Sequence, residues 1–106
     1  MISVIKALVK FRDQRQWKKF HTPENLAKSI IIEAGELLEN FQWKNQALDL
    51  NNVKEEVADV MAYCLLLCEH YGFDPEVILK EKIAKNEAKY PVETVKGKST
   101  KYNRYK

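Results

Sequence analysis

The sequence predicts an all-α protein built from four helices. Apolar residues recur at helical spacing, and no segment alternates strictly between apolar and polar residues as a half-buried strand would. The three prolines and Gly72 fall where helices are expected to begin or end. The 106 residues make one domain with a modest core, which assembly into an oligomer would supplement.

The first helix is expected from Ile2 to Trp17. A capping signal marks the start of the second helix. Thr22 is a favoured N-cap residue, and Pro23 suits the first turn because the N–H that proline lacks would have no partner there. A second helix is therefore expected from Pro23 to Trp43.

The third helix is expected from Val53 to Tyr71. Asn52 and Glu55 resemble a capping box ahead of an apolar run. Gly72 directly follows Tyr71 and is typical of a helix C-terminus.

The fourth helix starts with a second cap-and-proline pair, Asp74 and Pro75, and is expected to end at Lys89. We expect one helical domain over residues 1–95. Residues 96–106 hold five basic residues and no acid, so they are interpreted as a basic C-terminal tail.

The composition bears on the location of the protein, on its partners and on the state of its cysteines. No apolar run approaches the ~20 residues of a membrane span, and no charged segment followed by an apolar one opens the chain, so a cytoplasmic location is expected. The net charge of +3 excludes neither a nucleotide nor a nucleic-acid partner. Cys64 and Cys68 lie in an apolar context without a histidine cluster, and are expected to be buried thiols.

Two acidic pairs suggest a metal site. Glu33 and Glu36, and likewise Glu56 and Asp59, are three residues apart, so each pair shares one helix face beside an apolar stripe. Antiparallel packing of the two helices would bring the four carboxylates together. Their repulsion grows with burial, and a divalent cation would offset it. Oxygen ligands suit Mg²⁺, with Mn²⁺ as an alternative.

Two other interpretations fit these acids less well than a Mg²⁺ site: acids that are simply exposed to solvent, and ligands of a di-iron centre. One such pair alone is usually solvated, but two pairs at matched positions of consecutive helices favour a metal. A di-iron site would need Glu-x-x-His pairs, which the sequence lacks. A Mg²⁺ site commonly takes its remaining ligands from phosphate oxygens, which indicates a phosphorylated substrate.

The segments "EAGELLENFQW" and "EEVADVMAY" resemble the MazG-like all-α nucleoside triphosphate pyrophosphohydrolases, and among these the dCTP pyrophosphatase branch. "WKKFHTPENL", "KIAKNEAKYPV" and "GKSTKY" extend the similarity from Phe11 to Tyr102. The resemblance implies a MazG-like bundle completed by dimer or tetramer assembly, with pockets shared between subunits. It also implies Mg²⁺ on the two acidic pairs and cleavage of a nucleoside triphosphate, dCTP or a modified dCTP, to the monophosphate and pyrophosphate. Such a reaction cleans the nucleotide pool.

The resemblance gives roles to residues that could also serve the fold alone. Trp17 and Trp43 would line a base pocket, although tryptophan more often anchors a core. His21 and Asn25 would recognise base or sugar, and His21 would otherwise make a hydrogen bond at the helix terminus. Tyr63, one turn after the second acidic pair, either packs against deoxyribose or packs within the protein.

The fourth helix carries a basic face. Such a stripe is usually solvated, and we expect this for Lys89. A triphosphate has about four negative charges, however, which Mg²⁺ alone does not neutralise beside four carboxylates. The resemblance singles out Lys82 and Asn86, followed by Tyr90. The residues expected to bind phosphate or lie beside it are Lys82, Lys85, Asn86, Tyr90, Lys98 and Lys101.

The expected chemistry is metal-assisted hydrolysis, in which Glu33 or Glu36 orients or deprotonates the attacking water. The sequence shows no arrangement typical of a covalent intermediate and no glycine-rich phosphate loop. Two alternatives stay open. One is a non-catalytic helical oligomeric module that binds nucleotides or nucleic acid through its basic tail, and the other is a catalytically silent relative.

Gly35 lies in the middle of the second expected helix, where glycine costs about 1 kcal/mol relative to alanine. It faces away from Glu33 and Glu36. Close approach of another helix, from a second subunit, would explain the glycine.

Overall fold

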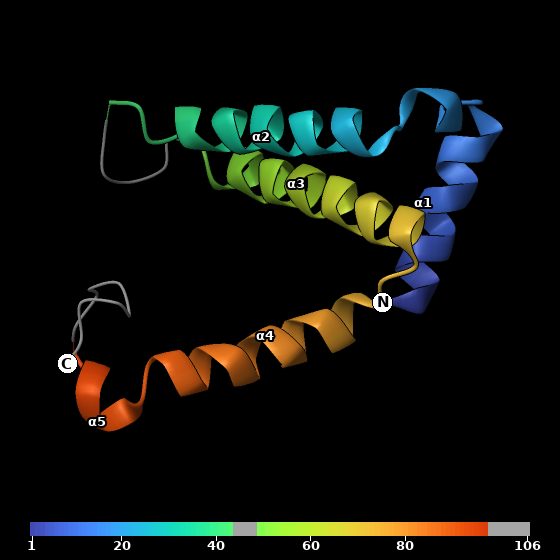
Figure 1. Ribbon diagram of the computed structural model, residues 1–106. Coiled ribbons are helices and arrows are strands. Elements are labelled where there is room, and N and C mark those ends of the chain that lie inside the picture. The colour runs from blue at the N-terminus through green and yellow to red at the C-terminus, as the bar shows by residue number, and fades with distance from the viewer. Residues whose placement is uncertain (44–48, 98–106) are drawn as a thin grey trace. The chain divides into compact units, whose positions relative to one another are not determined.

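The computed structural model describes residues 1–43 and 49–97, and it contains helices and no strand over these residues. The all-α prediction is therefore confirmed. The chain divides into two compact units, residues 1–73 and 74–106, each of which is described by itself. The elements are α1 (Ile2–Gln14), the 3₁₀ turn η1 (Lys18–Phe20), α2 (Pro23–Glu39), α3 (Leu50–Tyr71), α4 (Pro75–Lys89) and α5 (Val92–Val95) (Figure 1).

Helices α2 and α3 form the packed centre of the first unit. They run antiparallel, side by side, as expected for the helices that carry the acidic pairs (Figure 1). Leu26 on α2 and Leu65 and Leu66 on α3 are buried. Where the two helices join, the Asn52 side chain donates a hydrogen bond to Oδ1 of the buried Asn40 at 3.0 Å. Apolar packing at one end and this bond at the other fix the register of the pair.

Three helix ends follow the predicted signals. The Thr22 hydroxyl accepts a backbone N–H in the first turn of α2 at 3.2 Å, and the Asp74 carboxylate accepts two at the start of α4 at 2.9 and 3.3 Å. These bonds satisfy N–H groups that a helix leaves without internal partners. Gly72 ends α3 with a φ of 72°, in the left-handed region that glycine adopts without strain.

The junction between α2 and α3 differs from the prediction. Asp49, not Asn52, is the N-cap of α3, because its carboxylate accepts two backbone N–H groups at 2.9 and 3.4 Å. The predicted capping box is therefore wrong, and α3 begins earlier, at Leu50. α2 ends at Glu39 rather than Trp43, where the Asn40 side chain donates to a carbonyl of the last turn at 3.2 Å.

Helix α1 also ends earlier than predicted, at Gln14 rather than Trp17. Gln16 has a φ of 57°, in the left-handed region. The N–H of Gln16 donates to the carbonyl of Asp13 at 3.0 Å, and that of Trp17 donates to the carbonyl of Arg12 at 3.1 Å. This is the Schellman pattern of a helix terminus, with glutamine where glycine is usual. The sequence lacks the glycine that would have predicted this end.

The outer face of the first unit is rich in exposed apolar side chains. Within residues 1–43 and 49–73 the buried apolar residues are three leucines, whereas Ile31 is 71% exposed and Leu38 67%. The prediction of two buried thiols is wrong for Cys64, which is exposed because it faces outward on α3, while Cys68 is half-buried. None of the described helices is long and apolar enough to span a membrane.

Candidate active site

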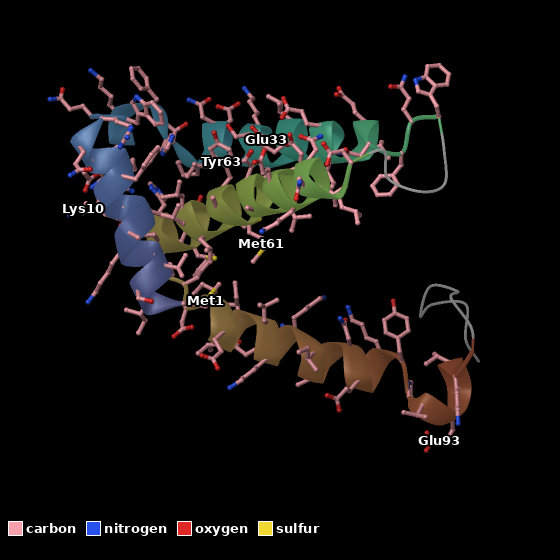
Figure 2. The ribbon with its side chains drawn as sticks, turned by 180° about the vertical axis from the view of Figure 1, so that it is seen from behind. Met1, Lys10, Glu33, Met61, Tyr63 and Glu93 are labelled. Carbon is pink, nitrogen blue, oxygen red and sulfur yellow. The ribbon has the colours of Figure 1, made fainter. Side chains whose placement is uncertain are left out.

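Acidic residues of α2 and α3 meet where these helices face each other. One carboxylate oxygen from each of Glu33, Glu56 and Asp59 lies within 4.8 Å of the other two. Oε2 of Glu33 and Oε2 of Glu56 are buried without a hydrogen-bond partner. The side chains of Glu33 and Tyr63 lie along the facing sides of α2 and α3 (Figure 2). Oxygens without partners at this spacing suit a divalent cation that takes hard oxygen ligands.

The electrostatics of the cluster support that interpretation. Burial, then the neighbouring Glu36, and then the other acids raise the pKa of Glu33 to about 7. Burial and then Glu36 also raise the pKa of Glu56. Glu36 is exposed and is not one of the three residues whose oxygens converge, but its charge acts on both half-buried carboxylates. A bound cation would replace the protons that the cluster otherwise attracts.

A pocket of about 420 Å³ opens beside the acids, between α1 and α3. Its α1 side is mainly apolar and includes Leu8 and Phe11, and Trp17 contributes a further aromatic side chain. Asp59 belongs both to the pocket wall and to the acidic cluster. A ligand in the pocket would therefore contact apolar and aromatic surface at one end and carboxylates at the other. The volume is in the range of small-molecule sites.

Trp17 is placed in this pocket by the turn that ends α1. Its ring packs edge-to-face against Phe11, with ring centroids 5.7 Å apart. It remains 43% exposed, so part of its surface is available to a ligand. Trp17 thus belongs to a pocket wall rather than to the end of a long helix.

His21 and Tyr63 form the polar part of the wall. Their rings meet edge-to-face at 6.3 Å, and Nδ1 of His21 is buried without a hydrogen-bond partner. Burial and then the charge of Arg12 lower the pKa of His21, which favours the neutral imidazole. Burial and then the charges of Glu33 and its neighbours raise the pKa of Tyr63, which keeps the phenol protonated. Both side chains can therefore offer neutral hydrogen-bonding groups to a ligand.

Two further residues of the first unit that were predicted to bind the substrate, Asn25 and Trp43, do not line this pocket. The exposed Asn25 side chain donates to the carbonyl of Phe20 at 3.0 Å and is absent from the pocket lining. Trp43 is 81% exposed. Lys82, Lys85 and Asn86 lie on α4 and Tyr90 caps that helix, all in the second unit, whereas Lys98 and Lys101 lie outside the described residues.

Sequence reasoning missed Arg12. It is 4% exposed and lines the pocket, although arginine is rarely buried. A weak signal was present, because Arg12 follows Leu8 by four residues and so interrupts the apolar stripe of α1. Its partner, Glu69, is too distant along the chain for the sequence alone to indicate the pair.

Comparisons with known proteins identify a family. The profile of the MazG-like family matches residues 28–104. dCTP pyrophosphatase 1 of Rattus norvegicus is 33% identical and that of Homo sapiens 31%, each over 87% of this chain. The chain spans 59% of the length of these relatives.

A solved structure is also similar. The crystal structure of a pyrophosphatase from Archaeoglobus fulgidus DSM 4304 matches with a TM-score of 0.79 and 45% identity, over 86% of this chain and 92% of that one. Since the family profile covers most of the sequence and the fold agrees throughout the aligned part, the chain belongs to the MazG-like family.

Proposed function

We propose that the protein hydrolyses a nucleoside triphosphate to the monophosphate and pyrophosphate. The observation that carries this proposal is the position of Asp59, which joins the carboxylate cluster to an aromatic-lined pocket. One ligand can thus place a base against Trp17 and its phosphates near the acids. The pyrophosphatase names of the mammalian relatives and of the archaeal structure support the same reaction class.

The proposal includes a divalent cation, Mg²⁺ or alternatively Mn²⁺, held by Glu33, Glu56 and Asp59 with Glu36 beside them. The partnerless buried oxygens of Glu33 and Glu56 support this ligand set. When bound, such a cation supplies positive charge to the phosphates and lowers the pKa of a water ligand.

The residues of the chain supply the remaining functions. Glu33 or Glu36 orients or deprotonates the attacking water, a role that carboxylates commonly fill in hydrolysis. Trp17 stacks on the base, a contact worth ~1–3 kcal/mol in nucleic-acid complexes. His21 contacts base or sugar through its neutral ring, and Tyr63 packs against the sugar.

The substrate is proposed to be dCTP or a modified dCTP, which the names of the mammalian relatives support. In this role the enzyme removes unwanted nucleotides, and the cytoplasm, where such nucleotides are used, is the proposed location. Asn25 and Trp43 are proposed to contact the nucleotide in the complete assembly. The proposed phosphate-side residues remain Lys82, Lys85, Asn86, Tyr90, Lys98 and Lys101.

A homodimer or homotetramer is proposed to complete the site. The outer face of α2 supports this, since Ile31 and Ile32 are 71% and 61% exposed and line an apolar hollow with Ala27. A Cβ added at Gly35 would meet no described atom within 4 Å, so nothing described in the protomer requires a glycine there. A neighbouring subunit that approaches closely would require it.

The test is product analysis with a panel of dNTPs and NTPs, with and without Mg²⁺. The proposal predicts Mg²⁺-dependent release of pyrophosphate, fastest with a deoxycytidine nucleotide. Release of orthophosphate would overturn the reaction class. Salt-dependent oligonucleotide binding without turnover would support a non-catalytic module instead.

A further inference from the structure

Within the protomer, helix α1 forms a wall of the pocket without a fully buried apolar residue. Leu8 lines the pocket and is half-buried, as are Ile5 and Val9, whereas Phe11 is 47% exposed. Arg12 is the one residue of this 13-residue helix that is buried. Because short helices depend on tertiary packing, the contacts of Arg12 are expected to contribute to the position of α1 beside this partial apolar burial.

Those contacts join α1 to α3. Nη1 of Arg12 donates to Oε2 of Glu69 at 3.0 Å, and Nε donates to Oδ1 of Asp13 at 2.9 Å. The Arg12 side chain is 5% exposed and that of Glu69 32%. Within residues 1–43 and 49–97, the bond to Glu69 is the only side-chain hydrogen bond between α1 and α3. Charge-assisted bonds of this kind are stronger and more directional than neutral ones.

The same residue holds the turn that presents Trp17. The Arg12 carbonyl accepts the Trp17 N–H at 3.1 Å. Arg12, His21 and Leu66 also line both the main pocket and a second, polar cavity of about 290 Å³. Arg12 is therefore part of the wall that separates the two cavities. A shift of Arg12 away from α3 would move the α1 wall and Trp17 together.

We propose that Arg12, through its ion pair with Glu69, is a positioning residue that holds the α1 wall and Trp17 against α3 and so strengthens nucleotide binding in the pocket. The effect on nucleotide binding rests on the function proposed above. With the ion pair intact, α1 and Trp17 stay against α3 and contact the base. Without it, the α1 wall recedes and these contacts weaken. The carboxylate cluster lies between α2 and α3 and is not moved.

The first test is steady-state kinetics with dCTP. Arg12→Met is expected to raise KM for dCTP at least 10-fold while kcat changes less than 3-fold. Arg12→Lys keeps the charge and should raise KM less, and it is the milder variant if Arg12→Met folds poorly. Lys80→Met, which removes the exposed ion pair with Glu76 on α4, is the matched control and should leave both constants unchanged.

The second test needs no turnover. Hydrogen exchange of the nucleotide-free protein should become at least 10-fold faster in residues 2–14 of Arg12→Met, with exchange in α2 and α3 unchanged. Unchanged exchange in α1, or an unchanged KM for dCTP in an active enzyme, would overturn the proposal. A wild-type protein that hydrolyses no nucleotide, combined with faster exchange in the variant, would overturn the proposed function and retain the Arg12–Glu69 tie as the contact that positions α1.

Discussion

The α2–α3 pair and helix α1 are held in place in different ways. Buried leucines pack α2 against α3, and this rigid pair presents the acidic cluster. Helix α1 has no fully buried apolar side chain and is tied to α3 through Arg12. The difference suggests two roles: the packed helix pair positions the proposed metal-binding and catalytic carboxylates, and helix α1, which lacks a fully buried apolar side chain, forms a wall of the pocket. Changes in the two regions should therefore affect different kinetic constants.

The largest effect is expected in the packed pair. Glu56→Gln and Asp59→Asn should each lower kcat at least ~1,000-fold, because each removes a charge that is proposed to ligate the metal. KM for the nucleotide should change much less. Pyrophosphate release measures this, and Glu55→Gln, an exposed neighbour on α3, is the control that should stay active. Full activity in either cluster variant would contradict the metal assignment.

Substitutions in the pocket wall are expected to have a smaller effect, and to change KM rather than kcat. Trp17→Ala should raise KM by about 10- to 100-fold, since base stacking is worth ~1–3 kcal/mol. Trp17→Phe keeps an aromatic face beside Phe11 and should lose less. Kinetics with dCTP would measure both variants. A loss of kcat at unchanged KM would mean that Trp17 does not bind the base.

In the metal-free protein, burial of the carboxylates and repulsion among them should make the stability of the fold depend on pH. The pKa of Glu33 is raised from 4.5 to about 7, so between these values the folded state holds a proton that the unfolded state releases. The contribution of Glu33 to stability is therefore fully present below pH 4.5 and is lost as the pH rises through about 7.

Melting temperatures test this directly. Without metal, Glu33→Gln should gain stability over the wild type as the pH rises from about 5 to about 8. Added Mg²⁺ should stabilise the wild type more at the higher pH, because protons no longer compete for the cluster. A difference between wild type and variant that does not change with pH would contradict the raised pKa.

Substitutions in the turn after α1 should have a still smaller effect, on the stability of the protein. Gln16→Gly should raise stability by up to about 1 kcal/mol, because glycine adopts the left-handed conformation without steric cost. Gln16→Val should lower it, since a β-branched side chain is poorly tolerated at positive φ. Denaturant unfolding measures both. Equal stability of the two variants would argue against the observed turn.

An effect of similar size is expected at Gly35 on helix α2. In an isolated protomer Gly35→Ala would gain about 1 kcal/mol of helix propensity, since its Cβ meets open space. In a tightly packed oligomer the same change should weaken assembly. Analytical ultracentrifugation and melting temperature distinguish these cases. An unchanged oligomeric state with unchanged or improved stability would exclude a close subunit contact at Gly35.

The contrast between the α2–α3 pair and helix α1 also explains which features could be predicted from the sequence and which could not. The acidic pairs of α2 and α3 were found because helical spacing within one segment places Glu56 and Asp59 on one face. The pocket wall was not found in full, because it depends on contacts distant in sequence, such as Arg12 with Glu69. The end of α1 was missed because Gln16 takes the conformation that glycine usually signals.

The central claim is that α2 and α3 share at least one divalent cation between them. Diffraction from Mn²⁺-soaked crystals tests this claim most directly. We predict an anomalous peak within coordinating distance of Glu33, Glu56 and Asp59. Carboxylates of these residues pointing into separate regions of solvent, with manganese bound elsewhere or not at all, would contradict the account.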